Sequence, residues 1–209
     1  MQLIRGLYNL TQPLPPCTVT IGNFDGIHLG HQQVLKQLKA VADKSKLCSA
    51  VIIFEPQPIE YFAPSKAPKR LARFREKIAY LKSQKIDYLL CLKFDQSFSE
   101  LTAEQFVQDL LVKWLNTKHL VIGDDFRFGK NRAGNFESLQ IYGQQYDFAV
   151  DNTQTLLLGG LRVSSTRIRE CIQNDNFDLA AALLGRPYSL SGKVTHGQKL
   201  GRELGFPTI

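Results

Sequence analysis

The chain has 209 residues, of which 44% are hydrophobic and 22% are charged, and its formal net charge is +7 at pH 7. This composition predicts one large or two small globular domains with a proper core. No apolar stretch has the length of a membrane span, and residues 1–10 lack the apolar core of a secretory signal. We therefore expect a cytoplasmic protein with no membrane partner.

The four cysteines show no Cys-x-x-Cys spacing, which argues against a zinc knuckle or a disulfide framework and favours reduced, structural thiols.

The positive charge suits either a nucleic-acid binder or an enzyme whose substrates carry phosphates. The densest basic run, residues 66–77, contains one aromatic residue, and we interpret it as the first part of an amphipathic helix with a solvated face. Nucleic-acid binding therefore stays the alternative.

Apolar β-rich segments alternate with helical patterns along the chain, which predicts an α/β fold with a parallel sheet. The expected strands are residues 19–22, 50–54, 88–92 and 120–122. Helical spacing is present in residues 34–41, 78–81, 165–173 and 177–184, and a capping box at 102–105 precedes a helix over 106–115. Helices thus cross over between successive strands.

Residues 20–31, TIGNFDGIHLGH, follow the first expected strand and open a helix. His28 and His31 would lie on one face of the first turn, where free backbone N–H groups and the helix dipole favour an anion. Gly22, Gly26 and Gly30 would let a triphosphate approach the backbone closely. The pattern thus predicts a phosphate site.

The other interpretations of this run fit less well. The glycine spacing matches neither the dinucleotide fingerprint nor the P-loop. Two histidines could ligate a metal, but only His119 and His196 remain as further histidines, and no cysteine is close in sequence. A pair of histidines that merely bonds its own helix start is the other alternative.

Three further segments are candidates for the same binding site. Prolines at 56, 58, 64 and 68 predict an ordered, non-helical loop after the second strand. Residues 123–129 follow another strand, and ligands bind beyond the carboxyl ends of parallel strands, so this loop should converge with residues 22–31. Residues 164–169, SSTRIR, predict a helix start with hydroxyl caps, where two arginines either grip phosphates or form a solvated face.

Several of these runs resemble one known family of enzymes. The resemblance is to nucleotidyltransferases, and more narrowly to the bacterial bifunctional riboflavin kinase/FMN adenylyltransferases, or FAD synthetases. It is carried in order by GNFDGIHLGH at 22–31, FEPQPIEYF at 54–62, GDDFRFGKNRAGN at 123–135, SSTRIRE at 164–170 and GRPYSLSGKVTHGQKLGRELGFPT at 185–208. This implies a Rossmann-like nucleotidyltransferase domain that joins AMP from ATP to FMN, with Mg²⁺ as the cofactor, small-molecule substrates and no nucleic-acid partner.

The resemblance also implies roles for individual residues. The catalytic group would be His28, His31 and Asn23. ATP would be bound by Gly22, Phe24, Asp25, Gly26, Gly30, Asp124, Arg127, Ser165, Thr166 and Arg169. Apolar walls for the flavin ring would come from Pro56, Pro58, Phe62 and Phe128, although these side chains equally suit a core. Gln57 stands where some relatives carry histidine.

The predicted domains are residues 1–185, the adenylyltransferase, and residues 186–209, the first strand and loop of an incomplete β-barrel kinase module. A helix stop at this boundary is predicted by Gly185-Arg186-Pro187. Thr208 would match a magnesium-contacting threonine of the kinase, an activity expected only of a longer chain. Two alternatives stay open, an adenylyltransferase for another phosphate acceptor and an RNA-binding module related to class I aminoacyl-tRNA synthetases; the oligomeric state is not predicted.

Overall fold

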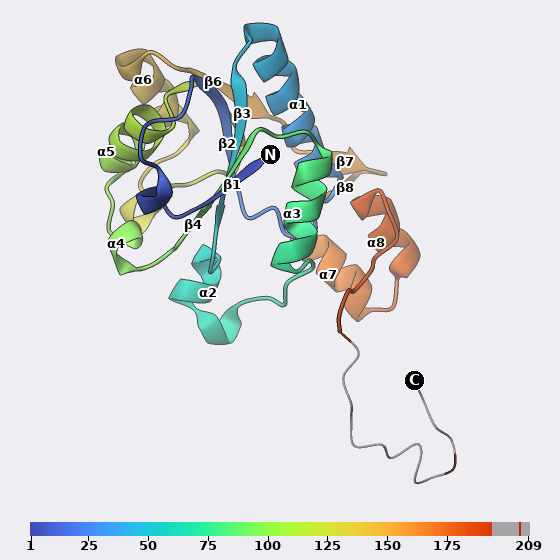
Figure 1. Ribbon diagram of the computed structural model, residues 1–209. Helices are drawn as coiled ribbons and strands as arrows, with labels where there is room; N and C mark the ends of the chain where they lie inside the picture. Colours follow the sequence, from blue (N-terminus) through green and yellow to red (C-terminus); the bar gives the residue numbers. More distant parts are fainter. Residues whose placement is uncertain (194–204, 206–209) are drawn as a thin grey trace.

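The computed structural model describes residues 1–193 and 205, and its centre is a six-stranded parallel sheet with the order β1-β4-β3-β2-β5-β6 (Figure 1). The four predicted strands are confirmed. They are β2 (Cys17–Ile21), β3 (Cys48–Phe54), β4 (Tyr88–Leu92) and β5 (Thr117–Gly123). The sequence analysis missed the two edge strands, β1 (Gln2–Arg5) and β6 (Ala149–Thr153), because each buries a single residue and so lacks the continuous apolar run of a central strand.

The strand order creates a switch point between β2 and β5. From β2 the chain moves through β3 to β4 in one direction, and then returns to place β5 and β6 on the other side. In open parallel sheets, ligands bind outside the carboxyl ends of the strands at such a point. The loops after Ile21 and Gly123 leave the sheet there.

Helices cover both faces of the sheet. The side chains of Val51 and Ile53 join the cluster that holds α1 (Leu29–Ser45) and α3 (Phe74–Ser83). Their neighbours Ala50 and Ile52 point to the opposite face and join the larger cluster, which includes η3 (Phe106–Trp114) and α6 (Phe136–Tyr146). This alternation is the period of two of a strand buried on both faces.

The predicted capping box is present at the start of the helix that leads into η3. Thr102 Oγ1 accepts from the N–H of Gln105 at 3.1 Å, and Gln105 Oε1 accepts from the N–H of Thr102 at 2.9 Å. After one turn, α5 (Ala103–Gln105), the helix widens to π geometry in η3. Shorter helices complete this part of the fold: η1 (Leu7–Asn9), α4 (Gln96–Ser99) and η4 (Lys130–Arg132).

The last helices form a small unit beside the sheet. The helices α7 (Ser165–Gln173) and α8 (Phe177–Leu184) have the predicted bounds, and their apolar sides pack with Leu71 and Val163. The two-stranded hairpin β7 (Leu157–Leu158) and β8 (Leu161–Arg162) leads into them. Figure 1 shows this unit below α1 and next to α3.

Two predicted features are wrong. The proline-rich segment contains a short helix, α2 (Pro58–Phe62), and a 3₁₀ turn, η2 (Pro64–Lys66), because proline fits the first helical position, whose N–H has no partner in the helix. The basic run becomes helical only from Phe74, and Lys77, expected on a solvated face, is only 1% exposed. Position 77 lies on the apolar stripe of α3 with Phe74, Ile78 and Leu81.

The cysteines are free thiols, as predicted. Cys17, Cys91 and Cys171 are buried and Cys48 is half-buried, while Cys17 and Cys48 are neighbours across β2 and β3. Burial is the main cause that raises the pKa of the Cys17 thiol to about 12.

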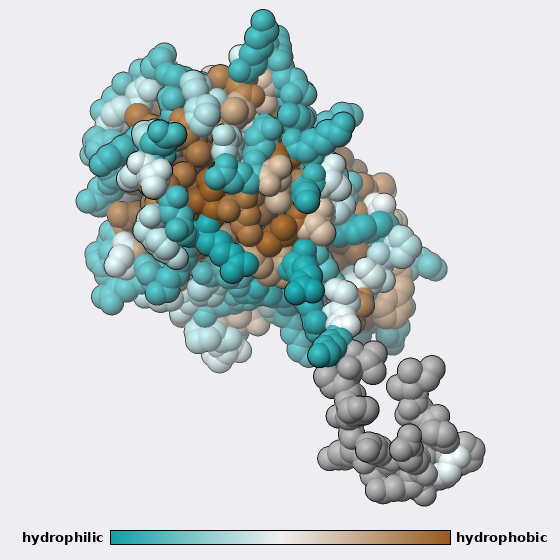
Figure 2. Space-filling model, in the orientation of Figure 1, coloured by the Kyte–Doolittle hydropathy of each residue, from teal (hydrophilic) through white to brown (hydrophobic). Residues whose placement is uncertain are grey.

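Residues 186–193 contain no helix or strand, and apart from Gly205 the remainder of the predicted kinase strand and glycine-rich loop, with Thr208, lies outside the described residues. Figure 2 shows hydrophobic residues gathered in the middle of one face, where Figure 1 draws β1 beside α3, and hydrophilic residues around them. Within the described part of the chain, no helix is both long and apolar enough to span a bilayer.

Candidate active site

Residues 22–31, here called the histidine turn, connect the end of β2 to α1. Three of its residues have positive φ: Phe24 at 48°, Gly26 at 77° and Ile27 at 40°. A side chain at Gly26 would place its Cβ 3.0 Å from Leu71 Cδ1, so glycine is needed there for space as well as for its backbone angle. The turn therefore presents the first residues of α1 at the switch point of the sheet.

His28 is the N-cap of α1, and its own ring caps the helix. Its Nδ1 accepts from the backbone N–H of His31 at 3.3 Å. An accepting Nδ1 needs a free lone pair, so the ring is neutral and carries its proton on Nε2. Burial is the main cause that lowers the pKa of His28 to about 4. At neutral pH the ring thus offers an N–H donor and no charge.

The ring of His31 stacks on that of His28, with centroids 3.7 Å apart and planes at 18°. The buried ring of Phe24 lies on it at 5.0 Å. Burial, followed by the charges of His28 and Lys77, holds the pKa of His31 well below its usual value. The prediction that both imidazoles share one face of the first turn is confirmed, and both are neutral at physiological pH.

The start of α7 lies against the histidine turn. Ser164 is the N-cap of α7 and accepts from the N–H of Arg167 at 3.2 Å, whereas Ser165 Oγ donates to the carbonyl of Asp25 at 2.9 Å. A Cβ on Gly30 would lie 3.2 Å from the His28 ring and 3.6 Å from the Val163 carbonyl. Two helix N-termini that are far apart in sequence therefore meet at one place, which the shared ATP site implied by the resemblance requires.

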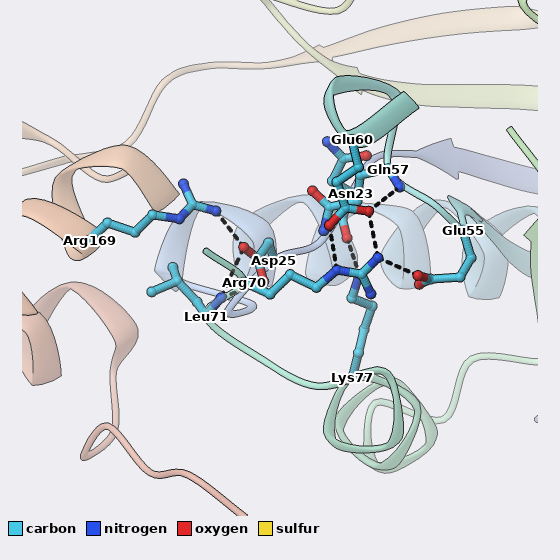
Figure 3. Close-up of polar contacts among 9 residues, drawn as sticks. All are labelled: Asn23, Asp25, Glu55, Gln57, Glu60, Arg70, Leu71, Lys77 and Arg169. Atoms are coloured by element: carbon cyan, nitrogen blue, oxygen red, sulfur yellow. Dashed lines mark hydrogen bonds and ion pairs between the residues drawn. The ribbon is translucent and has the colours of Figure 1, made fainter. Parts of the chain in front are cut away.

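Asp25 is the centre of a buried polar cluster in this contact (Figure 3). Its carboxylate is 4% exposed and accepts from the backbone N–H groups of Leu71 and Ala72 at 3.0–3.2 Å. It also pairs with Arg169 Nη2 at 2.5 Å, while Arg169 Nε donates to the carbonyl of Lys69 at 2.7 Å. The predicted phosphate ligands Asp25 and Arg169 thus hold each other, and the side chain of Thr166 is exposed at the first turn of α7.

Lys77 is a residue of this site that the sequence analysis placed wrongly. Its Nζ donates to the carbonyl of Asn23 at 2.6 Å, as Figure 3 shows. Desolvation lowers the pKa of Lys77, and the nearby Asp25 and Glu55 carboxylates oppose this. The helical spacing of α3 already puts position 77 on its buried face, so the pattern contains a signal for it.

Arg70 forms the second ionic group in Figure 3. Its Nε and Nη2 donate to Glu60 at 2.6 Å, and Nη2 also pairs with Glu55. Glu60 in turn accepts from the N–H of Gln57 at 2.8 Å and so caps α2. The hydrogen bond from Arg70 is the main cause that lowers the pKa of Glu60. This group fixes α2 at the end of β3.

The loop after β5 makes polar contacts with the hairpin that precedes α7 and with the residues just before that hairpin. Asp124 accepts from Thr155 Oγ1 at 2.7 Å, and Asp125 pairs with Arg162 Nη2 at 2.6 Å. Arg127, a predicted ATP ligand, is exposed and donates to the carbonyl of Phe126 at 3.1 Å. The loop therefore reaches the same region as the histidine turn, through the hairpin.

The predicted flavin wall is split between surface and core. Phe62 is 65% exposed, and its ring meets that of Phe94 at 5.5 Å. Phe128 is buried and packs on Phe106 at 5.2 Å. The exposed and the buried part of this predicted wall are linked through Phe98, whose ring contacts those of both Phe94 and Phe106. Pro56 and Pro58 are half-buried at the start of α2, and Gln57 between them is buried.

Comparison with known proteins agrees with this arrangement. A family model described as FAD synthetase matches residues 11–167, and one described as riboflavin kinase matches residues 184–209. The protein named bifunctional riboflavin kinase/FMN adenylyltransferase from Escherichia coli (strain K12) is 52% identical over 209 residues, which is 100% of this chain and 67% of that protein. The protein of the same name from Haemophilus influenzae is 50% identical over 208 residues, and the match covers 68% of it.

A solved structure named as a macrolide-efflux protein from Streptococcus pneumoniae has the same fold, with a TM-score of 0.80 at 28% identity. The match covers 95% of this chain and 66% of that one. The FAD synthetase model spans both the histidine turn and the start of α7, the two segments that meet in the structure. The chain belongs to the FAD synthetase family.

Proposed function

We propose that the chain is an FMN adenylyltransferase, which transfers AMP from ATP to FMN and releases pyrophosphate. One observation carries the proposal: two neutral imidazoles stack at the N-terminus of α1, at the switch point of a parallel sheet, beside the N-terminus of α7. Helix N-termini and N–H donors bind phosphates. Family membership and the names of the relatives supply the acceptor, the flavin mononucleotide.

In the proposed reaction, an oxygen of the FMN phosphate attacks the α-phosphorus of ATP, and the bond between that phosphorus and the bridging oxygen breaks. The electron pair of this bond leaves with pyrophosphate. No protein nucleophile is needed, so the protein contributes alignment of two anions and donors for the charge that grows on the phosphates. His28 Nε2–H is such a donor, and its orientation is fixed by the bond at Nδ1.

Ser165, Thr166 and Arg169 are proposed to bind the β- and γ-phosphates. The guanidinium of Arg169 has five N–H donors, and its contacts to Asp25 and Lys69 engage Nε and Nη2. Thr166 presents its hydroxyl at the surface of α7. For the flavin ring, we propose the exposed side of Phe62, with the half-buried Pro56 and Pro58 beside it, as the apolar wall.

Magnesium is proposed to enter with ATP as its phosphate complex. Within the described residues, no group of three or more histidine, cysteine or acidic side chains is arranged to hold a metal ion. Asp124 and Asp125 are already bonded to Thr155 and Arg162. Mg²⁺ commonly keeps its waters and binds through substrate phosphates, which fits this donor set.

We further propose that residues 1–185 form the adenylyltransferase domain and that it acts in the cytoplasm on small molecules. The alternative of RNA binding has less support, because Arg70 and Lys77 of the basic run are used in internal contacts. The proposal concerns adenylyl transfer alone, since the riboflavin kinase model matches only residues 184–209.

The test is to incubate the purified chain with ATP, FMN and Mg²⁺ and to quantify FAD and pyrophosphate. We expect both products in equal amounts, and none when Mg²⁺ is chelated. Parallel reactions with nicotinamide mononucleotide or phosphopantetheine as acceptor test the other transferases. Folded protein that forms no FAD but turns over another acceptor would contradict the flavin assignment, and salt-sensitive RNA binding without turnover would contradict the enzyme assignment.

A further inference from the structure

The histidine turn needs support from outside, because its backbone adopts an unfavourable conformation. Gly26 and Ile27 have positive φ in succession, and for a β-branched residue such as Ile27 this region is strongly disfavoured. These two residues directly precede His28, so their geometry sets where both imidazole rings lie. Their carbonyls accept hydrogen bonds from side chains that lie outside these two residues.

Arg186 supplies those donors from the other end of the domain. Its Nη2 donates to the carbonyl of Gly26 at 2.6 Å and its Nη1 to that of Ile27 at 3.0 Å. The guanidinium also lies over the ring of Tyr80 in α3, 5.0 Å from its centroid. A planar fork that bonds two successive carbonyls while it stacks on an aromatic ring has little rotational freedom.

The end of α8 brings Arg186 to this position. Gly185 ends the helix with φ of 71°, and a Cβ there would lie 2.6 Å from Leu29 Cδ2, in the first residue of α1. Gln32 Nε2 donates to the carbonyls of both Ile27 and Leu184, at 3.1 and 2.9 Å. The C-terminus of α8 and the N-terminus of α1 are therefore joined side by side.

One side of the turn borders a cavity, and few donors reach its carbonyls. A cavity of about 100 Å³ lies behind Gly26 and Ile27, and Tyr80 and Arg186 form part of its lining. Among the described contacts, Arg186 is the one side-chain donor to the Gly26 carbonyl, and it shares the Ile27 carbonyl with Gln32.

We propose that Arg186 is a positioning residue for adenylyl transfer, which holds the Gly26 and Ile27 carbonyls so that His28 and His31 face the phosphates. The proposal rests on the proposed function of this turn. Residue 186 falls within the part matched by the riboflavin kinase model, so the turn is held by a residue beyond the segment that the FAD synthetase model matches.

The experiment combines variants at two positions in the FAD-forming assay. Arg186→Gln should lower kcat/KM for ATP by about 10- to 100-fold, and Arg186→Lys, which keeps the charge and one contact, by less. In a His28→Ala background, Arg186→Gln should lower kcat/KM by less than about threefold, because the effects of two residues that act through one another are not additive. A loss of the same size in both backgrounds would overturn the proposal.

The chain offers a matched control for these variants. Arg5 stacks on Phe74 of the same helix, α3, at 5.3 Å, and among the described contacts it has no bond to the histidine turn. Arg5→Gln should leave kcat/KM within twofold of the parent. A loss equal to that of Arg186→Gln would show that contacts with α3, and not the two carbonyls, matter, and would overturn the proposal.

A second readout does not depend on the reaction. The ¹H–¹³C ring signals of His28 and His31 report their orientation and charge, to which Asp25, Arg162, Arg186 and Lys77 contribute. Arg186→Gln should shift both sets of signals, and Arg5→Gln neither. Unchanged ring signals would contradict the proposed role, whereas shifted signals in a chain that forms no FAD would support it and contradict the proposed function alone.

Discussion

At the scale of single residues, His28 has two tasks that use different atoms of one ring. Nδ1 accepts the helix N–H of His31, and Nε2–H remains for a ligand. A substitution that keeps the first task and removes the second can therefore separate folding from catalysis. Asparagine is among the strongest N-cap residues, because its side-chain oxygen accepts from the same backbone group.

We expect His28→Ala and His31→Ala each to lower turnover by roughly 100- to 1,000-fold, which is the usual effect of losing one oriented donor. His28→Asn should lose as much activity as His28→Ala while its melting temperature stays close to that of the parent. Steady-state assays of FAD formation with calorimetry on the same samples measure both quantities. Parental turnover in all three variants would remove the role assigned to these rings.

Protonation of His28 should make the fold sensitive to acid. The folded pKa of about 4 lies below the ordinary value of 6.5, so the unfolded chain binds the proton more readily. The contribution of His28 to the free energy of unfolding is fully present above pH 6.5. It falls by about 3 kcal/mol as the pH decreases from 6.5 to 4. Urea unfolding across this pH range should show that the free energy of unfolding falls less steeply for His28→Asn than for the parent. Parallel curves for the two proteins would contradict the lowered pKa of His28.

At the scale of elements, strand prediction succeeded where burial on both faces makes a continuous apolar run, as in β3, and failed at the edges. Helix bounds were most accurate at α7 and α8, where caps and apolar spacing agree. Lys77 and Arg186 could not be assigned their contacts from the sequence, because the atoms they bond lie 54 and about 160 residues away along the chain. Such contacts depend on tertiary packing, and no local pattern encodes them.

The junction of α6 and β6 provides a test of close packing between elements. A Cβ on Gly143 would lie 2.5 Å from the carbonyl oxygen of Phe148, a backbone atom that cannot move freely. Overpacking costs about 1–3 kcal/mol and outweighs the gain of roughly 1 kcal/mol that alanine offers within a helix. Gly143→Ala should therefore lower the free energy of unfolding, and Gln144→Ala, at the exposed next position, should change it by less than about 0.5 kcal/mol. Chemical denaturation measures both, and a stabilised Gly143→Ala would show that the junction can relax.

At the scale of the whole molecule, the small unit of α7 and α8 is held to the sheet by polar contacts at the histidine turn. Asp25 contributes two of them, because its carbonyl accepts from Ser165 and its carboxylate binds Arg169, and the same carboxylate accepts from the backbone of Leu71 and Ala72. The fold of each part follows from its own apolar core, and the two parts are joined by polar contacts of Asp25, whose carboxylate is almost completely buried, together with those of Gln32 and Arg186.

Asp25→Asn should separate these parts locally before the sheet unfolds. The amide keeps the shape but leaves the guanidinium of Arg169 without its negative partner, which in buried pairs costs about 3–5 kcal/mol. Hydrogen exchange should accelerate in α7 and α8, while the central strands β2 and β3 keep their protection. Uniform acceleration across the chain would mean that the two parts form one cooperative unit.

The buried thiols also give the chain a built-in reporter of its opening. A thiol that is enclosed in the sheet and retains its proton, such as Cys17, reacts with alkylating reagents only when the surrounding strands separate. Labelling of Cys17 should therefore be slow in the native protein and follow the opening of the central sheet, whereas Cys171, in α7, should follow the smaller helical unit. Mass spectrometry of the modified peptides would time the two events within one sample, without any introduced probe.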